Sequence, residues 1–464
     1  MKRSVPEYLQ SIKVDLAEAV EALETKFPFA QALFTEQDGI GMSISGKAAS
    51  IGSQPPRRGA VLSVFNGMYY AELASSDISR TNLNALVERL KTAIPVEKGL
   101  VPEPGDSWEG DFFSLCLEDP RTFSNRDKMD HLKAMQTRFS QMSPRIASAF
   151  IRYSERIDRK VYVNRNKRLF QELISSVCVP GVVVTDGKTT KVYHGGNGIQ
   201  GGFEVARISD DDLNQIVTNA EKLLHAEHIE PGVYDVAGGP SLAGVIAHEA
   251  FGHGVEADMF VNKRAMAAHF MNKTVASPIV DLIDNPALQG QSASYFFDDE
   301  GYPASETHIL ENGILRRVLT DQRSAMLLNI PRTANGRRES YANKVYARMS
   351  NTYFAPGTHT IDEMIASIDD GLYMPDGSNG MEDPKSWGIQ VESPYAEEIK
   401  NGKLTGKIYS PVVITGFVPD LLKSITMVGD TLGFMGLGTC QKGHKEQVRV
   451  AIGGPALKMK ARVG

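Results

Sequence analysis

The chain has 464 residues, of which 42% are hydrophobic and 23% are charged, a composition typical of a soluble globular protein. This length exceeds what one ordinary hydrophobic core accommodates, so we expect two domains. The net charge of −6 argues against a nucleic-acid binder that holds its partner through an overall basic surplus.

The N-terminal segment and the cysteines of the chain indicate the cellular compartment in which we expect the protein. The first six residues lead into a charged amphipathic segment, and no run of about 18 apolar residues follows. We therefore expect no signal peptide and no membrane span. Cys116, Cys178 and Cys440 lie far apart and are odd in number, which is not a disulfide framework. A reducing cytoplasm is the expected location.

The first half of the chain alternates helix and strand patterns. In chain order we expect a helix over 7–26, a β-meander over 29–74, helices over 80–93 and 126–141, short strands over 146–194, and a helix capped by Asp210 and Asp211. Turn signals inside the meander fall at Asp38-Gly39 and Asn66-Gly67, and the second is a strong hairpin signal. A polar segment over 225–231 then ends in Pro-Gly, and we place the domain boundary there.

The second half opens with an expected strand over 233–237 and a helix for which Ser241 is a plausible cap. Beyond about residue 275 strand and turn signals dominate. The predicted fold is therefore α+β, with an α/β N-terminal domain over 1–228. A β-rich C-terminal domain over 229–464 carries the helix near its start.

This helix contains His248 and His253, with Glu249 directly after the first histidine. The familiar zinc-peptidase helix places its two histidines four residues apart, on one face. Five residues correspond to about 500° of helix rotation, which leaves the two side chains roughly 140° apart. Both can reach one ion only if the helix widens or ends between them. Gly252 and Gly254 provide the backbone freedom for such an irregularity.

A catalytic zinc site needs three protein ligands and an open position. Beyond the two histidines, the sequence offers Glu256, His269, Cys440 and His444 as the third ligand, and local spacing does not choose among them. Glu249 is interpreted as the general base that takes a proton from the attacking water. The same histidines would also suit a structural metal in a non-catalytic scaffold or pairing subunit. The unliganded carboxylate of Glu249 favours catalysis.

Several motifs together resemble the TldD/PmbA peptidases, also called modulators of DNA gyrase. The most specific is the segment from His248 to Asp258. Others, similar in order and spacing, are Asp298-Asp299-Glu300-Gly301, Glu311-Asn312-Gly313-Ile314-Leu315, Arg348-Met349-Ser350-Asn351-Thr352-Tyr353 and Gly438-Thr439-Cys440-Gln441-Lys442-Gly443. The resemblance extends over nearly the whole chain and is looser in the N-terminal half.

The resemblance implies a zinc peptidase in which His248, His253 and Cys440 hold Zn²⁺ and Glu249 is the base. It also implies a dimer that encloses the site, either a homodimer or a heterodimer with a PmbA-like subunit. The implied substrates are short or unfolded peptides. The chain departs from the family pattern directly after Cys440, where His444 stands near the expected site.

Three further residues are candidates for substrate binding. Arg348 belongs to a basic stretch that could meet an acidic substrate or the other subunit. Asn351 and Tyr353 follow it closely and could present their side chains to a bound peptide. Solvated-loop, core or turn roles are the alternatives for these residues.

Overall fold

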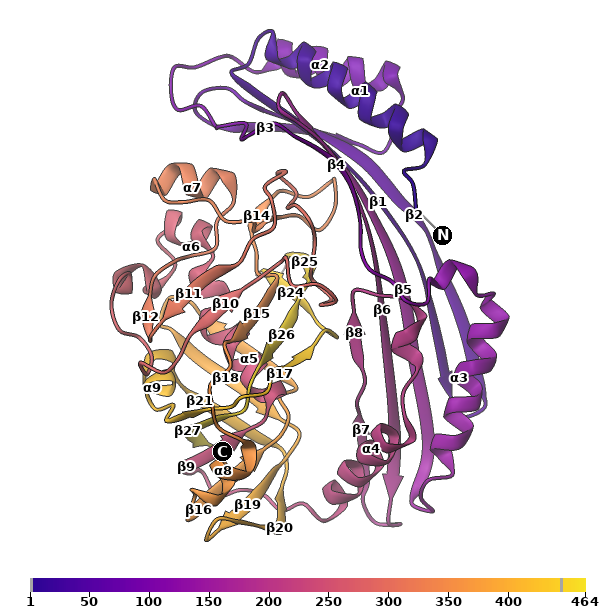
Figure 1. Ribbon diagram of the computed structural model, residues 1–464, viewed down its shortest axis with the longest axis vertical. Coiled ribbons are helices and arrows are strands. Elements are labelled where there is room, and N and C mark those ends of the chain that lie inside the picture. The colour runs from indigo at the N-terminus through magenta and orange to yellow at the C-terminus, as the bar shows by residue number, and fades with distance from the viewer. Residues whose placement is uncertain (1–2, 443–444) are drawn as a thin grey trace.

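The computed structural model describes residues 3–442 and 445–464 and shows a long curved sheet beside a second group of sheets (Figure 1). The mixed helix and strand content predicted from the sequence is confirmed. The residues before 200 form the long sheet, and the residues after 231 form the other sheets. A domain boundary at residue 228 stays a prediction.

The long sheet has the strand order β3-β2-β1-β5-β6-β4, and β7 and β8 also pair with β6. All of these pairings are antiparallel except that between β4 and β6. Its strands are β1 (Phe29–Ser45), β2 (Ala48–Phe65), β3 (Tyr70–Ser75), β4 (Trp108–Phe113), β5 (Ile146–Asn164), β6 (Lys167–Thr185), β7 (Thr190–His194) and β8 (Asn197–Ile199).

The predicted meander over 29–74 is present, but one of its two turns is not. The turn at Asn66-Gly67 joins β2 to β3 as expected, whereas β1 continues through Asp38-Gly39 with only a shift in register. A Cβ on Gly39 would lie 2.6 Å from the carbonyl oxygen of Glu155, so this glycine permits close strand approach. The expectation of short strands over 146–194 was also wrong. β5 and β6 are 19 residues each, because each pairs along its length with neighbours.

Four helices pack on this sheet: α1 (Glu7–Glu24), α2 (Arg80–Ala93), α3 (Asn125–Ser140) and α4 (Asp210–Lys222). Their predicted ranges agree with the structure to within two residues where both ends were predicted. The cap of α4 is a correction. Ser209 accepts a hydrogen bond from the Asp212 backbone N–H, and Asp210 and Asp211 lie inside the first turn.

The C-terminal residues form two larger sheets and two hairpins within the described ranges. The first sheet has the order β17-β18-β21-β27-β9-β16-β19-β20, with β22 on β27, and the second has the order β12-β11-β10-β15-β26-β23. Their strands are β9 (Gly232–Gly238), β10 (Leu282–Asp284), β11 (Thr307–Glu311), β12 (Ile314–Leu315), β15 (Asn351–Phe354), β16 (Asp370–Met374), β17 (Asn379–Asp383), β18 (Gly388–Ser393), β19 (Ala396–Lys400), β20 (Lys403–Tyr409), β21 (Val412–Phe417), β22 (Met427–Val428), β23 (Gly433–Met435), β26 (Ala451–Gly454) and β27 (Leu457–Val463). The hairpins are β13 (Gly336–Arg337) with β14 (Tyr346–Ala347), and β24 (Thr439–Lys442) with β25 (Lys445–Arg449).

Helix α5 (Pro240–Phe251) lies against both larger sheets, and its residues belong to the main hydrophobic core of this part. The helix is apolar almost all round, as expected for a buried helix. Shorter helices surround it: α6 (Ala257–Val261), α7 (Gln322–Leu328), α8 (Ile361–Ala366) and α9 (Val418–Lys423). None of the helices in the described ranges has the length and apolarity that a bilayer crossing requires.

Candidate functional site

The end of α5 places the two motif histidines on different backbone segments. Pro240 occupies the first helical position after Gly239, so Ser241 is not the cap that the sequence suggested. The helix ends at Phe251, and His253 begins a separate 3₁₀ turn that ends at Val255. The predicted interruption between the histidines is confirmed.

Gly252 forms the interruption and is tightly enclosed. A Cβ at this position would collide with the carbonyl oxygen of His248 and with the side chain of Met349. Only glycine fits where the chain leaves the helix so close to its own last turn. The local sequence therefore accounts for the turn that redirects His253.

His248, His253 and Cys440 converge at this turn. Their ligand atoms all lie within 4.8 Å of one another, and the Cys440 Sγ is 3.2 Å from the His253 Nε2. The two imidazole rings are nearly perpendicular, at 80°. The Nδ1 of His248 is buried and has no hydrogen-bond partner among the described residues. An orphaned imidazole nitrogen beside a thiol and a second imidazole fits a metal-binding set.

The electrostatics of this cluster favour a thiolate. Burial alone would raise the pKa of Cys440, but His248 and His253 lower it to about 5. For Glu249, burial raises the pKa above its ordinary value although both histidines oppose the shift. A thiolate is the form of cysteine that binds metal, and a raised carboxyl pKa suits a group that accepts a proton at neutral pH.

Glu256, the ligand candidate three residues after His253, lies on the other side of the His253 ring. Its Oε2 is 3.1 Å from the His253 Nδ1 and 2.9 Å from the Lys442 Nζ, and its Oε1 is 3.4 Å from the Arg348 Nε. Burial would raise the pKa of this carboxyl, but Lys442, His253 and Arg348 hold it well below the ordinary range. Glu256 is thus placed to orient His253, whose Nε2 faces Cys440.

The remaining ligand candidates are not part of this cluster. His269 is exposed on the short 3₁₀ helix over Met266–Phe270. His444 lies outside the described residues. Cys440 reaches the histidines from the β24–β25 hairpin, where it pairs with Val448.

Arg348, Asn351 and Tyr353, the three residues predicted to bind substrate, are all buried in this chain. The two terminal nitrogens of Arg348 donate to the carbonyl oxygens of Cys440 and Glu446, each at 2.8 Å. The amide nitrogen of Asn351 donates to the Asn285 carbonyl at 2.7 Å, and Tyr353 packs edge-on against Phe434. Arg348 therefore fixes the hairpin that carries Cys440, and substrate contact by these residues stays a prediction.

Two residues near the cluster were not predicted as site residues from the sequence. Lys442 is two residues after Cys440 on the same strand, so a period-two reading of β24 would have placed it on the same face. Glu382 accepts a hydrogen bond from the Gly254 N–H at 3.0 Å, and its other carboxyl oxygen is buried without a partner among the described residues. Nothing in the local sequence around Glu382 signals this placement.

Comparison with known proteins gives a family match over the C-terminal half. Residues 231–463 match the PmbA/TldA metallopeptidase C-terminal domain. A metalloprotease TldD homologue of Buchnera aphidicola is 36% identical over 229 residues, which are 49% of this chain and 47% of that protein. The chain thus spans about half the length of this relative. A zinc metalloprotease TldD homologue of Saccharolobus solfataricus is 29% identical over 73% of this chain and 75% of that protein.

Solved structures match over almost the full length. A putative modulator of a DNA gyrase from Thermotoga maritima superposes with a TM-score of 0.80 at 16% identity, covering 98% of this chain and all of that chain. TldE from Thermococcus kodakarensis superposes with a TM-score of 0.73 at 16% identity, covering 97% of this chain and all of that one. At these identities the likeness shows the shared fold.

Proposed function

Because the chain belongs to the PmbA/TldD family of metallopeptidases, we propose that it hydrolyses peptide bonds with a zinc ion held by His248, His253 and Cys440. The observation that carries this proposal is the convergence of these three ligand atoms within 4.8 Å, with Glu249 next to one of them in sequence. Two imidazoles and one thiolate form a three-ligand set of the kind that leaves a catalytic zinc its open position. When bound, the ion would supply Lewis-acid activation of water and of the peptide carbonyl.

Glu249 is the general base in this proposal. Its side chain lies against Gly380 of β17, where any Cβ would collide with it, so the carboxylate has a defined position. Its raised pKa makes it a better proton acceptor than an exposed glutamate. It would hold the proton of the attacking water and then return it to the leaving amine.

Glu256 and Arg348 act as positioning residues. The Nδ1–H of His253 would donate to Glu256, which leaves the Nε2 lone pair directed toward Cys440. Arg348 binds the carbonyl of Cys440 and lies beside Glu256, so one buried guanidinium aligns both sides of the ligand set.

Short or unfolded peptides are the proposed substrates. β17 ends the strand order of its sheet, and Gly380 on it contacts the Glu249 side chain. A peptide that adds to this edge as an extended strand would pass beside the base and would be bound mainly through its backbone. A folded protein uses its strands in its own ladders and cannot offer this geometry.

We also propose that the chain works as a dimer, either with itself or with a PmbA-like subunit. The structural likeness to TldE supports a relative of this kind as the partner. Light scattering of the pure chain, alone and mixed with such a subunit, measures the assembly. A chain that stays monomeric in both samples and keeps full activity at high dilution would refute the dimer.

The function is tested with Glu249→Gln, which preserves the shape of the side chain but cannot accept the proton. Metal analysis should find about one zinc per chain in both proteins. Cleavage of an unstructured peptide should fall by about 10²–10⁴-fold in the variant. Glu88→Gln, on the exposed side of α2, is the matched control and should cleave normally. Zinc-loaded wild type without any cleavage would instead support a structural metal in a scaffold subunit.

A further inference from the structure

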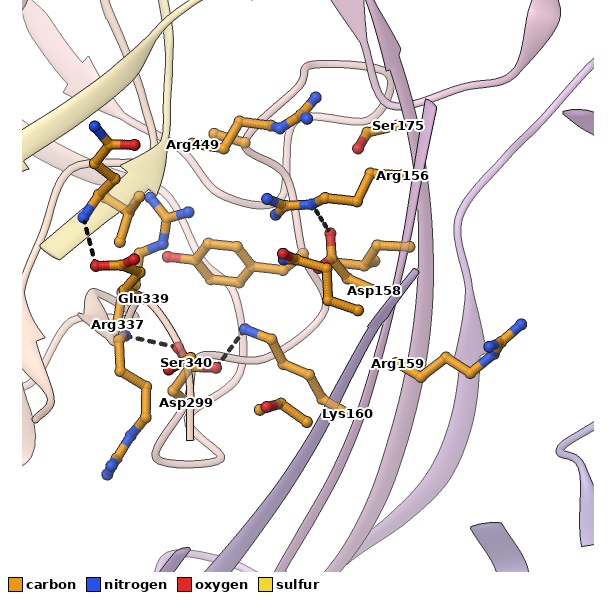
Figure 2. A pocket seen from close by; sticks show the side chains of 18 of the residues that line it. Arg156, Asp158, Arg159, Lys160, Ser175, Asp299, Arg337, Glu339, Ser340 and Arg449 are labelled. Atoms are coloured by element: carbon orange, nitrogen blue, oxygen red, sulfur yellow. Dashed lines mark hydrogen bonds and ion pairs between the residues drawn. The ribbon is translucent and has the colours of Figure 1, made fainter. Parts of the chain in front are cut away.

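A pocket of about 210 Å³ lies between the long sheet and the C-terminal part of the chain (Figure 2). Residues of β5 and β6 form one wall, and residues over 337–340 and the β24–β25 hairpin form another. The hairpin is the element that also carries Cys440. The pocket therefore borders the segment that completes the proposed metal site.

Among the described residues, the lining of this pocket has more basic than acidic side chains, with seven arginines and lysines against four carboxylates. Each carboxylate is already engaged. Asp158 binds Arg156 at 2.6 Å, and Glu36 binds Arg159 at 2.8 Å. Asp299 binds Lys160, and Glu339 accepts from the Gln447 backbone N–H at 3.1 Å. An excess of positive charge is left.

Arg449 is a basic residue of the lining whose charge has no ion-pair partner among the described residues. Its Nη1 is buried without a hydrogen-bond partner, and no carboxylate within 4 Å of it occurs among residues 3–442 and 445–464. Burial, together with the neighbouring Arg156, lowers the pKa of Arg449 to about 10, although Asp158 opposes the shift. Figure 2 shows Arg449 and Arg156 next to each other in the pocket. A buried guanidinium nitrogen without a hydrogen-bond partner is costly, so the Nη1 of Arg449 lacks an acceptor.

We propose that Arg449, with Arg156 beside it, binds a carboxylate of the peptide substrate in this pocket. The proposal rests on the proposed peptidase function. A guanidinium matches the geometry of a carboxylate through paired hydrogen bonds, and the Ser175 hydroxyl in the lining offers a further donor. The carboxylate is either the C-terminal one of the peptide or that of an Asp or Glu side chain.

The register of the hairpin places Arg449 close to Cys440 but on the opposite face of the hairpin. Cys440 pairs with Val448, and Arg449 pairs with Thr439, one position further along. The Cα atoms of Cys440 and Arg449 are therefore separated by roughly 6 Å, while an extended peptide advances about 3.3 Å per residue. A peptide with its scissile bond at the metal site would therefore have to pass around the edge of the hairpin to bring a carboxylate, a few residues away, to Arg449.

The test measures peptide binding to the zinc-loaded, full-length Glu249→Gln protein, which does not consume the peptide. One labelled hexapeptide is prepared with a free C-terminal carboxylate, with a C-terminal amide, and with each single Glu→Gln change. Fluorescence anisotropy should show that one of the carboxylates tightens binding by about 10-fold or more over its neutral counterpart. The position that matters identifies the source of the carboxylate.

When Arg449→Gln is added, the charged and neutral peptides should bind about equally well. The control Arg126→Gln, which changes an exposed arginine on α3, should leave the preference for the carboxylate unchanged. Arg449→Lys keeps the positive charge but lacks the planar guanidinium, so it should retain a reduced preference for the carboxylate. This variant provides the test if Arg449→Gln fails to fold. Equal binding of charged and neutral peptides by the parent protein would overturn the proposal. Cleavage of both peptides by the wild type would then leave the peptidase function intact.

Discussion

Replacement of Glu256 by glutamine tests whether Glu256 is itself a metal ligand or a residue that positions the proposed ligand His253. The carboxylate is fully buried and contacts His253, Lys442 and Arg348 at once. In Glu256→Gln the amide oxygen still accepts from the His253 Nδ1–H, but the negative charge is lost. We therefore expect two separate effects, one on stability and one on the affinity for zinc.

The stability effect follows from the two cations that Glu256 neutralises. Removal of one partner of a buried ion pair typically costs about 3–5 kcal/mol. Lys442 keeps a second carboxylate, Asp258, whose pKa burial raises to about 6 against the effect of Lys442. The Nε of Arg348 has no hydrogen-bond partner among the described residues, so it loses its counter-charge. The cost should therefore lie near the lower end of this range.

The metal effect follows from the hydrogen bond to His253. Loss of a partner that orients a ligand typically weakens metal binding by about 10–100-fold. A chelator competition assay should give this reduction for Glu256→Gln, and urea unfolding of the zinc-free protein should report the stability cost. Cys440→Ser, which removes a proposed ligand, should lose zinc under conditions in which Glu256→Gln still binds it.

A particular combination of results would refute this reasoning. If Glu256→Gln lost zinc completely while Cys440→Ser kept it, Glu256 would be the zinc ligand and Cys440 would not. If Glu256→Gln changed neither zinc affinity nor stability, the contacts of its carboxylate with His253, Lys442 and Arg348 would carry no energy. The exposed Glu88→Gln serves as the control for both measurements.

Three further predictions concern the site turn, a buried lysine and the substrate. Gly252→Ala should weaken zinc binding by more than about 10-fold in the chelator assay, because its Cβ has no space; Gly416→Ala, at an open position, should not. Burial lowers the pKa of Lys167 to about 8, so the unfolded chain binds more protons above that pH. Urea unfolding should show that the free energy of unfolding of the wild type, relative to that of Lys167→Met, rises between pH 8 and about 10.5. A denatured protein and its isolated peptides should be digested at several unrelated sequences, and its folded form hardly at all; equal rates would contradict strand addition.

The sequence predicted the histidine pair and the broken helix well because both are local. The five-residue spacing of His248 and His253 conflicts with one regular helix, and Gly252 resolves the conflict within the same segment. The helices of the N-terminal half were likewise readable from their apolar periodicity. Each of these features depends on residues less than a few turns apart.

The proposed third ligand and the residues that support it depend on contacts across the chain. Cys440 is 187 residues from His253, and spacing gave no reason to prefer it over Glu256. The prediction of Cys440 came from the family resemblance, and in the structure the Sγ of Cys440, on the β24–β25 hairpin, lies 3.2 Å from the His253 Nε2. The burial of Arg348 under that hairpin could not be predicted from the sequence either. A basic residue in a polar stretch has the same local sequence pattern whether it is buried or exposed.

The hairpin links the proposed metal site to the pocket because it contributes residues to both. Cys440 on β24 belongs to the proposed ligand set, and Arg449 on β25 lines the pocket. A ligand that binds only the folded arrangement stabilises it in proportion to its concentration over its dissociation constant. Zinc would therefore fix the hairpin against α5, and with it the position of Arg449. Peptide carboxylate recognition should accordingly weaken in zinc-free protein, even though Arg449 itself is not a ligand.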